Sequence, residues 1–237
     1  YMVYRMAGIT YDRGVQFDRD VGPFGITLGF TNGNGITDNF KINGTGYSRP
    51  DRMFDNDNSK TVFAHLGTDI GPVGVGLFGA SGKQLGAAGP AAMDKSQRRT
   101  DKRVVGVDAR GDVGGDMHWY AQYLWNDWRG FLDVDPTRNY RWNGGFAGLD
   151  WIPDDRWAFS ALYNYAGAGD FARSNTIYEG IAINSLSLTA SHYFMRNVKG
   201  IVELNIDFKN KTKPTGPYFT GHLNRENYIL FGFDTAF

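Results

Sequence analysis

The chain of 237 residues contains no cysteine. This absence excludes disulfide bonds, thiolate metal sites and covalent haem attachment through paired cysteines. No stretch approaches the roughly 18 consecutive apolar residues that a membrane-spanning helix needs. Charge of one sign is not in excess either, because 25 basic residues balance 25 acidic ones. The net charge therefore gives no reason to expect a nucleic-acid partner.

Glycine and aromatic residues are abundant. The chain has 32 glycines, which is roughly twice the average usage of about 7%, together with 17 Phe, 13 Tyr and 6 Trp. Such a composition is typical of closed all-β architectures. The mean hydropathy of −0.41 does not argue against a membrane barrel, because barrel strands alternate lipid-facing and lumen-facing residues.

Apolar side chains recur at every second residue along much of the chain. Phe24, Ile26, Leu28 and Phe30, for example, alternate with glycine and threonine. A helix would repeat its apolar positions every three or four residues instead. The pattern predicts strands of about ten residues, the length that crosses a bilayer at a tilt. These strands lie near 14–20, 24–31, 60–70, 73–83, 102–112, 117–127, 140–151, 157–165, 185–191, 198–209 and 226–237.

The connections between these strands alternate in length. Short turns are expected at 21–23, 70–72, 112–116, 152–156 and 195–200. Long polar loops are expected at 32–59, 84–101, 128–139, 166–182 and 210–225. Outer-membrane barrels have short periplasmic turns and longer external loops, whereas a β-sandwich does not require this alternation. We therefore expect an all-β fold: one antiparallel transmembrane β-barrel of 11–12 strands over residues 1–237, in the bacterial outer membrane.

The two faces of the strands differ in chemistry. One face is apolar and aromatic, with Trp119, Trp151 and Trp157 beside short turns, as in the aromatic girdles of membrane barrels. The other face is polar and ionic, and we expect it to line a pore. The expected pore-lining residues are Asp108, Arg110, Asp112, His118, Gln122, Glu203, Asn205, Asp207 and Lys209.

The last strand ends in an aromatic residue. Ile229, Phe231 and Phe233 alternate along one face, and Phe237 closes the sequence. This pattern resembles the signal that the outer-membrane barrel assembly machinery reads. We therefore expect that machinery to be a partner.

Two pairs of segments resemble the trimeric porins of the phosphate-selective family. The first pair is Arg13-Gly14-Val15-Gln16-Phe17 and 23–33, PFGITLGFTNG, which resemble a strand with an R-x-x-G-V-Q-like start and a strand ending F-N-G. The second is 104–110, VVGVDAR, and 119–124, WYAQYL, which are similar to the family's G-x-D-A-R and Y-x-Q-x-E-Y-L strands.

The resemblance implies a homotrimer, and it implies that this chain is the C-terminal part of a 16–18-stranded porin whose N-terminal strands are missing. A twelve-stranded barrel that uses residues 1–11 is the alternative. The family lines its channel with a ladder of arginines, but the expected pore-lining residues here mix both signs. Phosphate selectivity is therefore not carried over.

The expected function is passive diffusion of small hydrophilic solutes or ions, with no cofactor and no enzymatic activity. Outer-membrane lipids and lipopolysaccharide are expected partners. The stretch 32–60 is long enough to fold inward as a constriction. In it Arg49 and Arg52 would face Asp51, Asp55 and Asp57 across the opening.

Other functions are weaker alternatives. A structural barrel that surrounds or docks a multihaem cytochrome would place the haems in the partner. A barrel lipase would need a serine and a histidine on the outer wall, but Ser191 and His192 are adjacent and point to opposite faces. Gly74, Gly76 and Gly79 fit G-x-G-x-x-G, yet they lie inside a strand, where they give the lumen room or permit strand curvature.

One loop begins with the spacing of a calcium site. Asp55, Asp57 and Ser59 are spaced as its first ligands, but Lys60 and Leu66 stand where glycine and glutamate are needed. A solvated acidic loop is the simpler interpretation.

Overall fold

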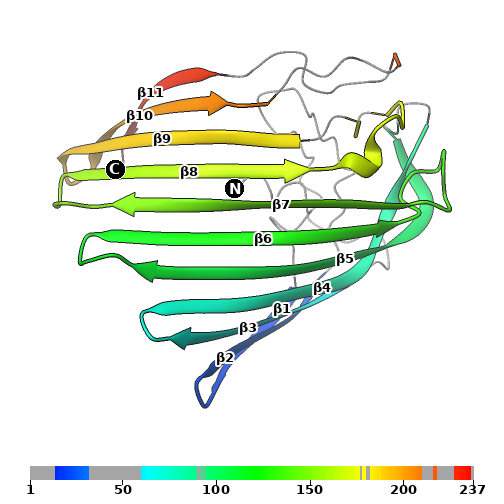
Figure 1. Cartoon of the computed structure of the whole chain (residues 1–237), viewed down its shortest axis with the longest axis horizontal. Coiled ribbons are helices and arrows are strands. Elements are labelled where there is room, and N and C mark those ends of the chain that lie inside the picture. The colour runs from blue at the N-terminus through cyan, green and yellow to red at the C-terminus, as the bar shows by residue number, and fades with distance from the viewer. Residues whose placement is uncertain are drawn as a thin grey trace.

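A computed structural model describes residues 14–31, 60–89, 92, 94–176, 178–179, 182–209, 216–217 and 227–235. They form one sheet in which every strand pairs with its neighbours in sequence, from the first to the eleventh (Figure 1). All pairings are antiparallel. The strands are β1 (Gly14–Val21), β2 (Phe24–Thr31), β3 (Thr61–Ile70), β4 (Val73–Ala88), β5 (Asp94–Asp112), β6 (Met117–Arg129), β7 (Asn139–Trp151), β8 (Trp157–Gly167), β9 (Ala182–Met195), β10 (Val198–Asp207) and β11 (Tyr228–Thr235).

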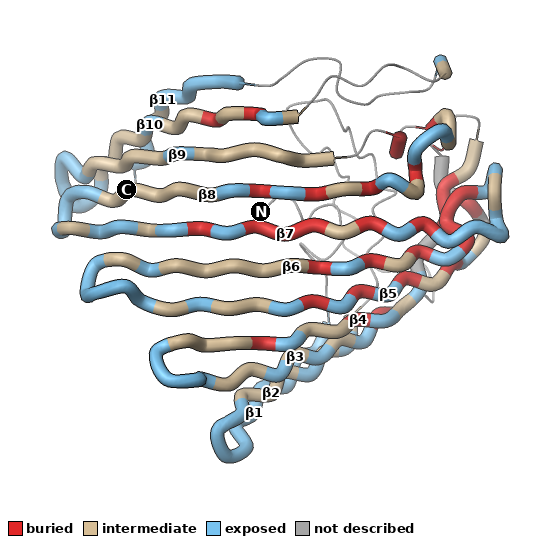
Figure 2. Tube along the Cα trace, viewed as in Figure 1, coloured by how far each residue is buried: buried red, intermediate tan, exposed pale blue. Residues whose placement is uncertain are grey.

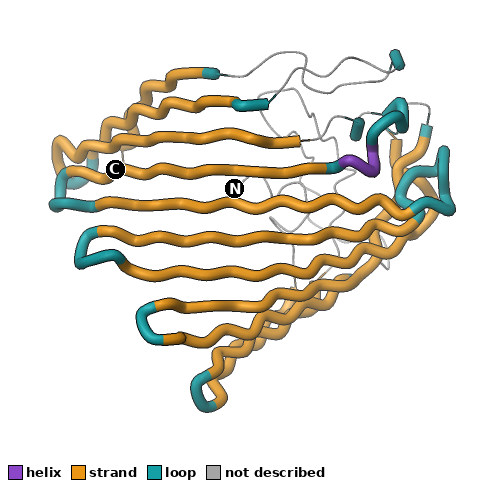
Figure 3. The backbone as a smooth tube through the Cα atoms, in the orientation of Figure 1, coloured by secondary structure: helices purple, strands orange, loops and turns teal. Residues whose placement is uncertain are grey.

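Short turns gather at one end of the sheet and longer connections at the other (Figure 3). The turns between β1 and β2 and between β3 and β4 are Gly22-Pro23 and Gly71-Pro72. Gly22 has a φ of 60° and Gly71 a φ of 61°, a conformation that glycine adopts without steric cost. The predicted short turns are confirmed, as are the longer connections between β6 and β7 and between β8 and β9.

One predicted loop is wrong. Residues 84–101 are mostly strand, because β4 continues to Ala88 and β5 begins at Asp94. The pairing runs from Lys83↔Asp101 to Ala88↔Asp94, with a register shift after Leu85. Residues 95–103 are almost entirely polar and show no alternation, but ladder hydrogen bonds join main-chain groups and do not require it. A smaller correction concerns Lys209, which follows the end of β10 at Asp207 instead of lying within the strand.

The sheet is curved, and its described strands form a partial barrel (Figure 1). In the described part of the chain the one helical element is η1 (Gly169–Phe171), and no helix there is long and apolar enough to span a membrane.

The register assigns each strand residue to one of two faces. Asp18 pairs with Thr27, and Thr27 pairs with His65; Asp108 pairs with Gln122, and Gln122 pairs with Phe146. Directly paired residues in a sheet share a face, so these residues all lie on one face. We call it the inner face. The opposite, outer face exposes large apolar side chains, including Val15, Phe17, Leu28, Leu77, Val105, Trp125, Phe231 and Phe233.

Burial is concentrated at the loop end of β5–β8 (Figure 2). Most of the remaining strand length is intermediate or exposed on both faces. The packed cluster of the described residues therefore lies at the loop end, and polar residues predominate along the rest of the inner face.

Candidate pore wall and its outer rim

The predicted pore-lining residues share the inner face. On β5 and β6 the register pairs Asp108 with Gln122 and Asp112 with His118, and Arg110 lies on the same face of β5. On β10, Glu203, Asn205 and Asp207 pair with Thr189, Ser187 and Ser185 of β9. We call the inner face, with these polar side chains, the pore wall.

A histidine that the sequence analysis did not single out contacts the pore wall. His65 Nε2 lies 2.8 Å from Asp108 Oδ2, although β3 and β5 are separated by β4. Gly76 of β4 lies between them, and a Cβ there would meet His65 Nε2 and the Asp108 carboxylate. The glycine thus provides the room that this pair needs, as the sequence predicted for the glycines of this strand.

The same arrangement recurs toward the short turns. A Cβ on Gly74 would lie 3.1 Å from Asp69 Oδ1 and 3.2 Å from Arg110 Nε, so these two side chains converge over this glycine. His118 Nδ1 lies 2.5 Å from Asp112 Oδ1. The predicted pore-lining residues of β5 and β6, with His65 and Asp69 of β3, therefore form a row of polar pairs.

The residues of β9–β11 are also fixed by hydrogen bonds. Tyr228 donates its hydroxyl proton to Glu203 Oε1 at 2.7 Å, and Ser187 Oγ donates to Asn205 Oδ1 at 2.9 Å. Lys209 Nζ donates to the carbonyl of Ala182 at 3.2 Å. The polar groups of this wall are held in place by their neighbours.

Acidic residues dominate the described inner face. The register places these carboxylates on it: Asp18, Asp20, Asp69, Asp108, Asp112, Asp150, Glu203, Asp207 and Asp234. The strand cations on the same face are Arg98, Lys102, Arg110 and Lys199; Arg98 pairs with Asp133 at 2.9 Å and Lys199 with Asp234 at 3.4 Å. The described wall therefore carries a negative balance, although the whole chain is formally neutral.

An aromatic cluster covers the pore wall at the loop end. Trp128 and Trp142 project from the inner faces of β6 and β7, with ring centroids 5.7 Å apart. Phe131 of the β6–β7 connection and Phe171 of η1 lie 4.9 and 6.0 Å from the Trp128 ring. Tyr140 stacks on Phe171 at 4.7 Å. The two connections thus fold over the inner face at this end. We call these rings and the connections that carry them the inner cover.

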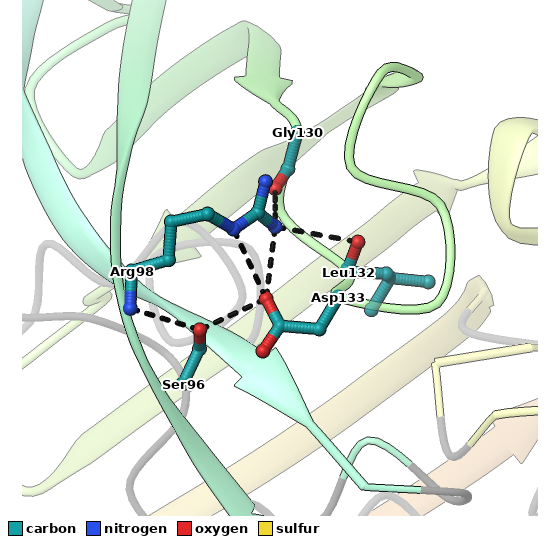
Figure 4. Close-up of polar contacts among 5 residues, drawn as sticks. All are labelled: Ser96, Arg98, Gly130, Leu132 and Asp133. Carbon is teal, nitrogen blue, oxygen red and sulfur yellow. Dashed lines mark hydrogen bonds and ion pairs between the residues drawn. The ribbon is translucent and has the colours of Figure 1, made fainter.

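Arg98 of β5 holds the β6–β7 connection of the inner cover (Figure 4). Its Nη2 donates to the carbonyls of Gly130 at 2.6 Å and Leu132 at 3.5 Å, and to Asp133 Oδ1 at 2.9 Å. Its Nε and Ser96 Oγ donate to the same carboxylate oxygen at 3.2 and 2.8 Å. The extension of β5 that was expected to be loop is therefore the support of the inner cover.

The β8–β9 connection has its own support. Arg173 and Asn175 have positive φ angles of 61° and 52°, which are uncommon for residues other than glycine. The buried carboxylate of Glu179 accepts hydrogen bonds from their backbone N–H groups at 2.7 and 3.0 Å. Such charge-assisted bonds stabilise the turn that positions Phe171.

The outer face carries a band of aromatic rings near the short turns of β7–β11. Successive centroid distances are 5.2 Å (Trp151–Phe159), 5.6 Å (Phe159–Trp157), 4.3 Å (Trp157–His192), 4.9 Å (His192–Phe194) and 6.3 Å (Phe194–Phe233). We call this set the aromatic belt. Amphipathic rings in such a row are typical of the membrane–water interface.

The residues expected to carry the assembly signal lie on the outer face of β11. Ile229 pairs with Leu204, Phe231 with Val202 and Phe233 with Gly200. Phe231 and Phe233 are each 76% exposed. Phe237 lies outside the described residues, and so do the expected constriction residues Arg49, Asp51, Arg52, Asp55 and Asp57.

No protein-family model and no curated protein matches this chain. Solved porin structures do match it. The anion-selective porin from Comamonas acidovorans superposes with a TM-score of 0.62 at 11% identity, over 100% of this chain and 66% of that one. The OmpF of Salmonella typhi solved with daunomycin gives 0.57 at 12%, over 92% and 60%.

A third match is OmpT of Vibrio cholerae in its trimer form, with a TM-score of 0.56 at 12% identity over 97% of this chain and 65% of that one. The chain thus spans less than two thirds of the length of these porins. At these identities the match establishes the fold alone. The chain has the fold of part of an outer-membrane porin barrel.

Proposed function

We propose that this chain forms part of a bacterial outer-membrane channel through which small hydrophilic solutes or ions diffuse passively. The observation that carries the proposal is the segregation of its two faces. Apolar and aromatic side chains are exposed on the outer face, while carboxylates, amides and hydroxyls follow the inner face. A soluble sheet would instead bury its apolar face.

The absence of native cysteine allows a direct test. Thr189 lies on the pore wall opposite Glu203, and its neighbour Leu188 lies on the outer face opposite Leu204. We expect Thr189→Cys channels in a planar lipid bilayer to lose conductance when a membrane-impermeant, water-soluble thiol reagent is added. Leu188→Cys channels should be unaffected, because lipid covers that position.

Two results would contradict the proposal. One is a purified, folded protein that never conducts. The other is a Leu188→Cys variant that reacts and blocks as readily as the Thr189→Cys variant, which would mean that the faces are reversed.

We also propose that the channel prefers cations. Charges that line a pore set its selectivity, and on the described wall carboxylates outnumber cationic groups. The Comamonas porin is described as anion-selective. That property is not transferred, because the wall of this chain carries the opposite balance.

Trimer formation is a further part of the proposal, supported by the description of OmpT from Vibrio cholerae in trimer form. Light scattering coupled to size-exclusion chromatography should give three times the protomer mass. A protomer mass at every protein concentration would contradict it.

Finally, we propose that the outer face of β11 is read during barrel assembly. Phe233 and Leu230 lie on opposite faces of this strand. Phe233→Asn should lower the fraction of heat-modifiable, membrane-inserted protein, whereas Leu230→Asn should not. Equal loss in both variants would indicate a general destabilisation of β11 instead.

A further inference from the structure

The outer face of β2–β8 has an apolar hollow of about 750 Å³. Its floor is made by small side chains in one row, because Ala109 of β5 pairs with Ala121 of β6, and Ala121 pairs with Ala147 of β7. Gly145 lies beside this floor and pairs with Tyr123 and Tyr165. The absence of large side chains along this row creates the depression.

Larger side chains form the rim of the hollow. Leu77 and Val107 pair with each other on one side, and Tyr123, Tyr163 and Tyr165 project on the other. Leu77 is 59% exposed. The hollow is thus an unpartnered apolar groove on the face that we propose to contact lipid.

Toward the loop end this groove continues into a second hollow of about 660 Å³ with charged residues. Tyr165 lines both hollows. Asp127 lies two residues beyond Trp125 on β6, toward the loop end. The register places Arg103, Asp127 and Arg141 side by side on β5, β6 and β7. We call these three residues the arginine row. The outer face therefore changes from apolar to charged along the same three strands.

The arginine row has unused capacity for an anion. Asp127 Oδ2 accepts from Arg129 Nε at 3.3 Å, while Arg141 Nε is 4.0 Å from Asp127 Oδ1. The Arg141 side chain is 73% exposed. Within the described part of the chain Arg103 has no ion pair, although it faces Asp127 in the register. Asp170 accepts a hydrogen bond from the Arg141 backbone and adds one further carboxylate. Together with Arg129, the row places three guanidinium groups beside two carboxylates, Asp127 and Asp170.

We propose that the arginine row and the apolar hollow together bind an anionic, phosphorylated lipid of the outer leaflet. A phosphate contacts Arg103 and Arg141, which recognise phosphate oxygens through several N–H groups, and an acyl chain lies over Ala109, Ala121 and Ala147. The spacing fits. Arg103 and Ala109 are six residues apart on β5, about 20 Å along an extended strand and about 15 Å of depth at a tilt of about 40°. That is about half the thickness of the hydrocarbon core of a bilayer.

Charge complementarity favours a lipid over a second copy of this chain. A phosphorylated lipid has its charged groups at the membrane surface and its apolar chains beneath them. The groove has the same arrangement, with charged residues at the loop end and the apolar hollow next to them. The proposal rests on the outer-membrane placement proposed above, but it does not require conduction.

The test measures lipid binding to the purified full chain in neutral detergent. The probes are diphosphoryl lipid A and the same lipid without phosphates. Native mass spectrometry measures how much of each lipid is bound to the protein. We expect diphosphoryl lipid A to bind about tenfold more tightly or better, as charge-assisted contacts require. The double variant Arg103→Gln/Arg141→Gln should remove this preference. Arg156→Gln, which removes a cation from a short turn at the opposite end of the sheet, is the matched control.

A second variant tests the hollow independently. Ala121→Trp should fill the groove and weaken binding of both lipids, while a cooperative melting transition shows that the variant is folded. If the variant does not fold, Ala147→Leu gives the same test with a smaller side chain.

Three outcomes would overturn the proposal. The first is equal binding of both lipids to the wild type, and the second is unchanged binding by the double variant. The third is that Ala121→Trp or Ala147→Leu changes the oligomeric state and leaves lipid binding unchanged. The last outcome would identify the groove as an interface between copies. A protein that binds the phosphorylated lipid but never conducts would contradict the proposed channel and leave the lipid site standing.

Discussion

His65 Nε2 and Asp108 Oδ2 approach to 2.8 Å across an intervening strand, and Gly76 is the residue that they cross. A methyl group at position 76 would occupy the space of both side chains. The contact joins residues 43 positions apart in the sequence. It joins β3 to β5 across the inner face.

Gly76→Ala should therefore break this pair. We expect a loss of about 1 kcal/mol in the free energy of unfolding, the typical net contribution of one hydrogen bond. The measurement is urea unfolding in lipid vesicles. Gly79→Ala is the control, since the added Cβ has no neighbour within 4 Å, and its effect should stay within about 0.5 kcal/mol. Equal effects of the two changes would show that the pair adds nothing to stability.

Removal of acidic groups from the pore wall should reduce the proposed cation preference. Asp69→Asn/Asp108→Asn removes two negative charges from the inner faces of β3 and β5. The reversal potential in a potassium chloride gradient should move toward zero, because lumen charges set selectivity. Asp155→Asn, in an exposed short turn, should leave the potential unchanged. A wild-type channel that favours chloride would contradict the prediction.

Loss of the Arg98 side chain should release the β6–β7 connection. Arg98→Gln removes the guanidinium that contacts Gly130, Leu132 and Asp133. Limited trypsin digestion should then cleave after Arg129 or Arg138 faster than in the wild type. Arg99→Gln removes the same charge from the outer face and should cleave at the wild-type rate. If the two variants are cleaved alike, Arg98 does not hold the inner cover.

The turn between β7 and β8 should show a pH dependence. Asp154 Oδ1 accepts hydrogen bonds from the backbone N–H groups of Arg156 and Trp157 at 2.7 and 2.8 Å. These bonds lower the pKa of the Asp154 carboxyl below its ordinary value of 3.8. The carboxylate therefore stabilises the folded state above that value, and the contribution is lost as the pH falls through the lowered pKa.

Asp154→Asn should accordingly unfold at a lower urea concentration at neutral pH. The difference from the wild type should shrink when the pH is lowered below 3.8. Asp155→Asn makes the same change of charge at the next residue and serves as the control. A difference that is constant with pH would show that ionisation of Asp154 does not contribute.

Periodicity of two was enough to predict the strands, the turns and the faces. Val202 and Glu203, for instance, lie on opposite faces as expected. It failed where both faces are polar, as in residues 95–103, because no alternation then distinguishes a strand from a loop. The backbone pairing of β4 with β5 continues there nonetheless.

The inner cover could not be derived in this way. Trp128, Tyr140 and Trp142 lie on the same face as Gln122, and a rule that assigns polar residues to the lumen does not expect large rings there. The sequence of β7 did contain a signal for these inward rings. Polar Arg141 and Asn143 alternate there with Tyr140 and Trp142, so the aromatic side chains lie on the inner face. The partners of those rings, Phe131 and Phe171, lie in connections whose paths depend on contacts distant in sequence. The His65–Asp108 pair was missed for the same reason, because it requires the register of three strands.

In the proposed outer-membrane placement, the outer face of β7 also indicates the thickness of the bilayer that this sheet would fit. Arg141 of the arginine row and Trp151 of the aromatic belt are ten residues apart on this strand, about 34 Å of extended chain. A strand tilted by about 40° converts that length into a vertical rise of about 25 Å, the height of the apolar band in bacterial outer-membrane barrels. A thicker bilayer would leave charged guanidinium groups or indole rings at the wrong depth, so the protein should insert most readily into short-chain lipids.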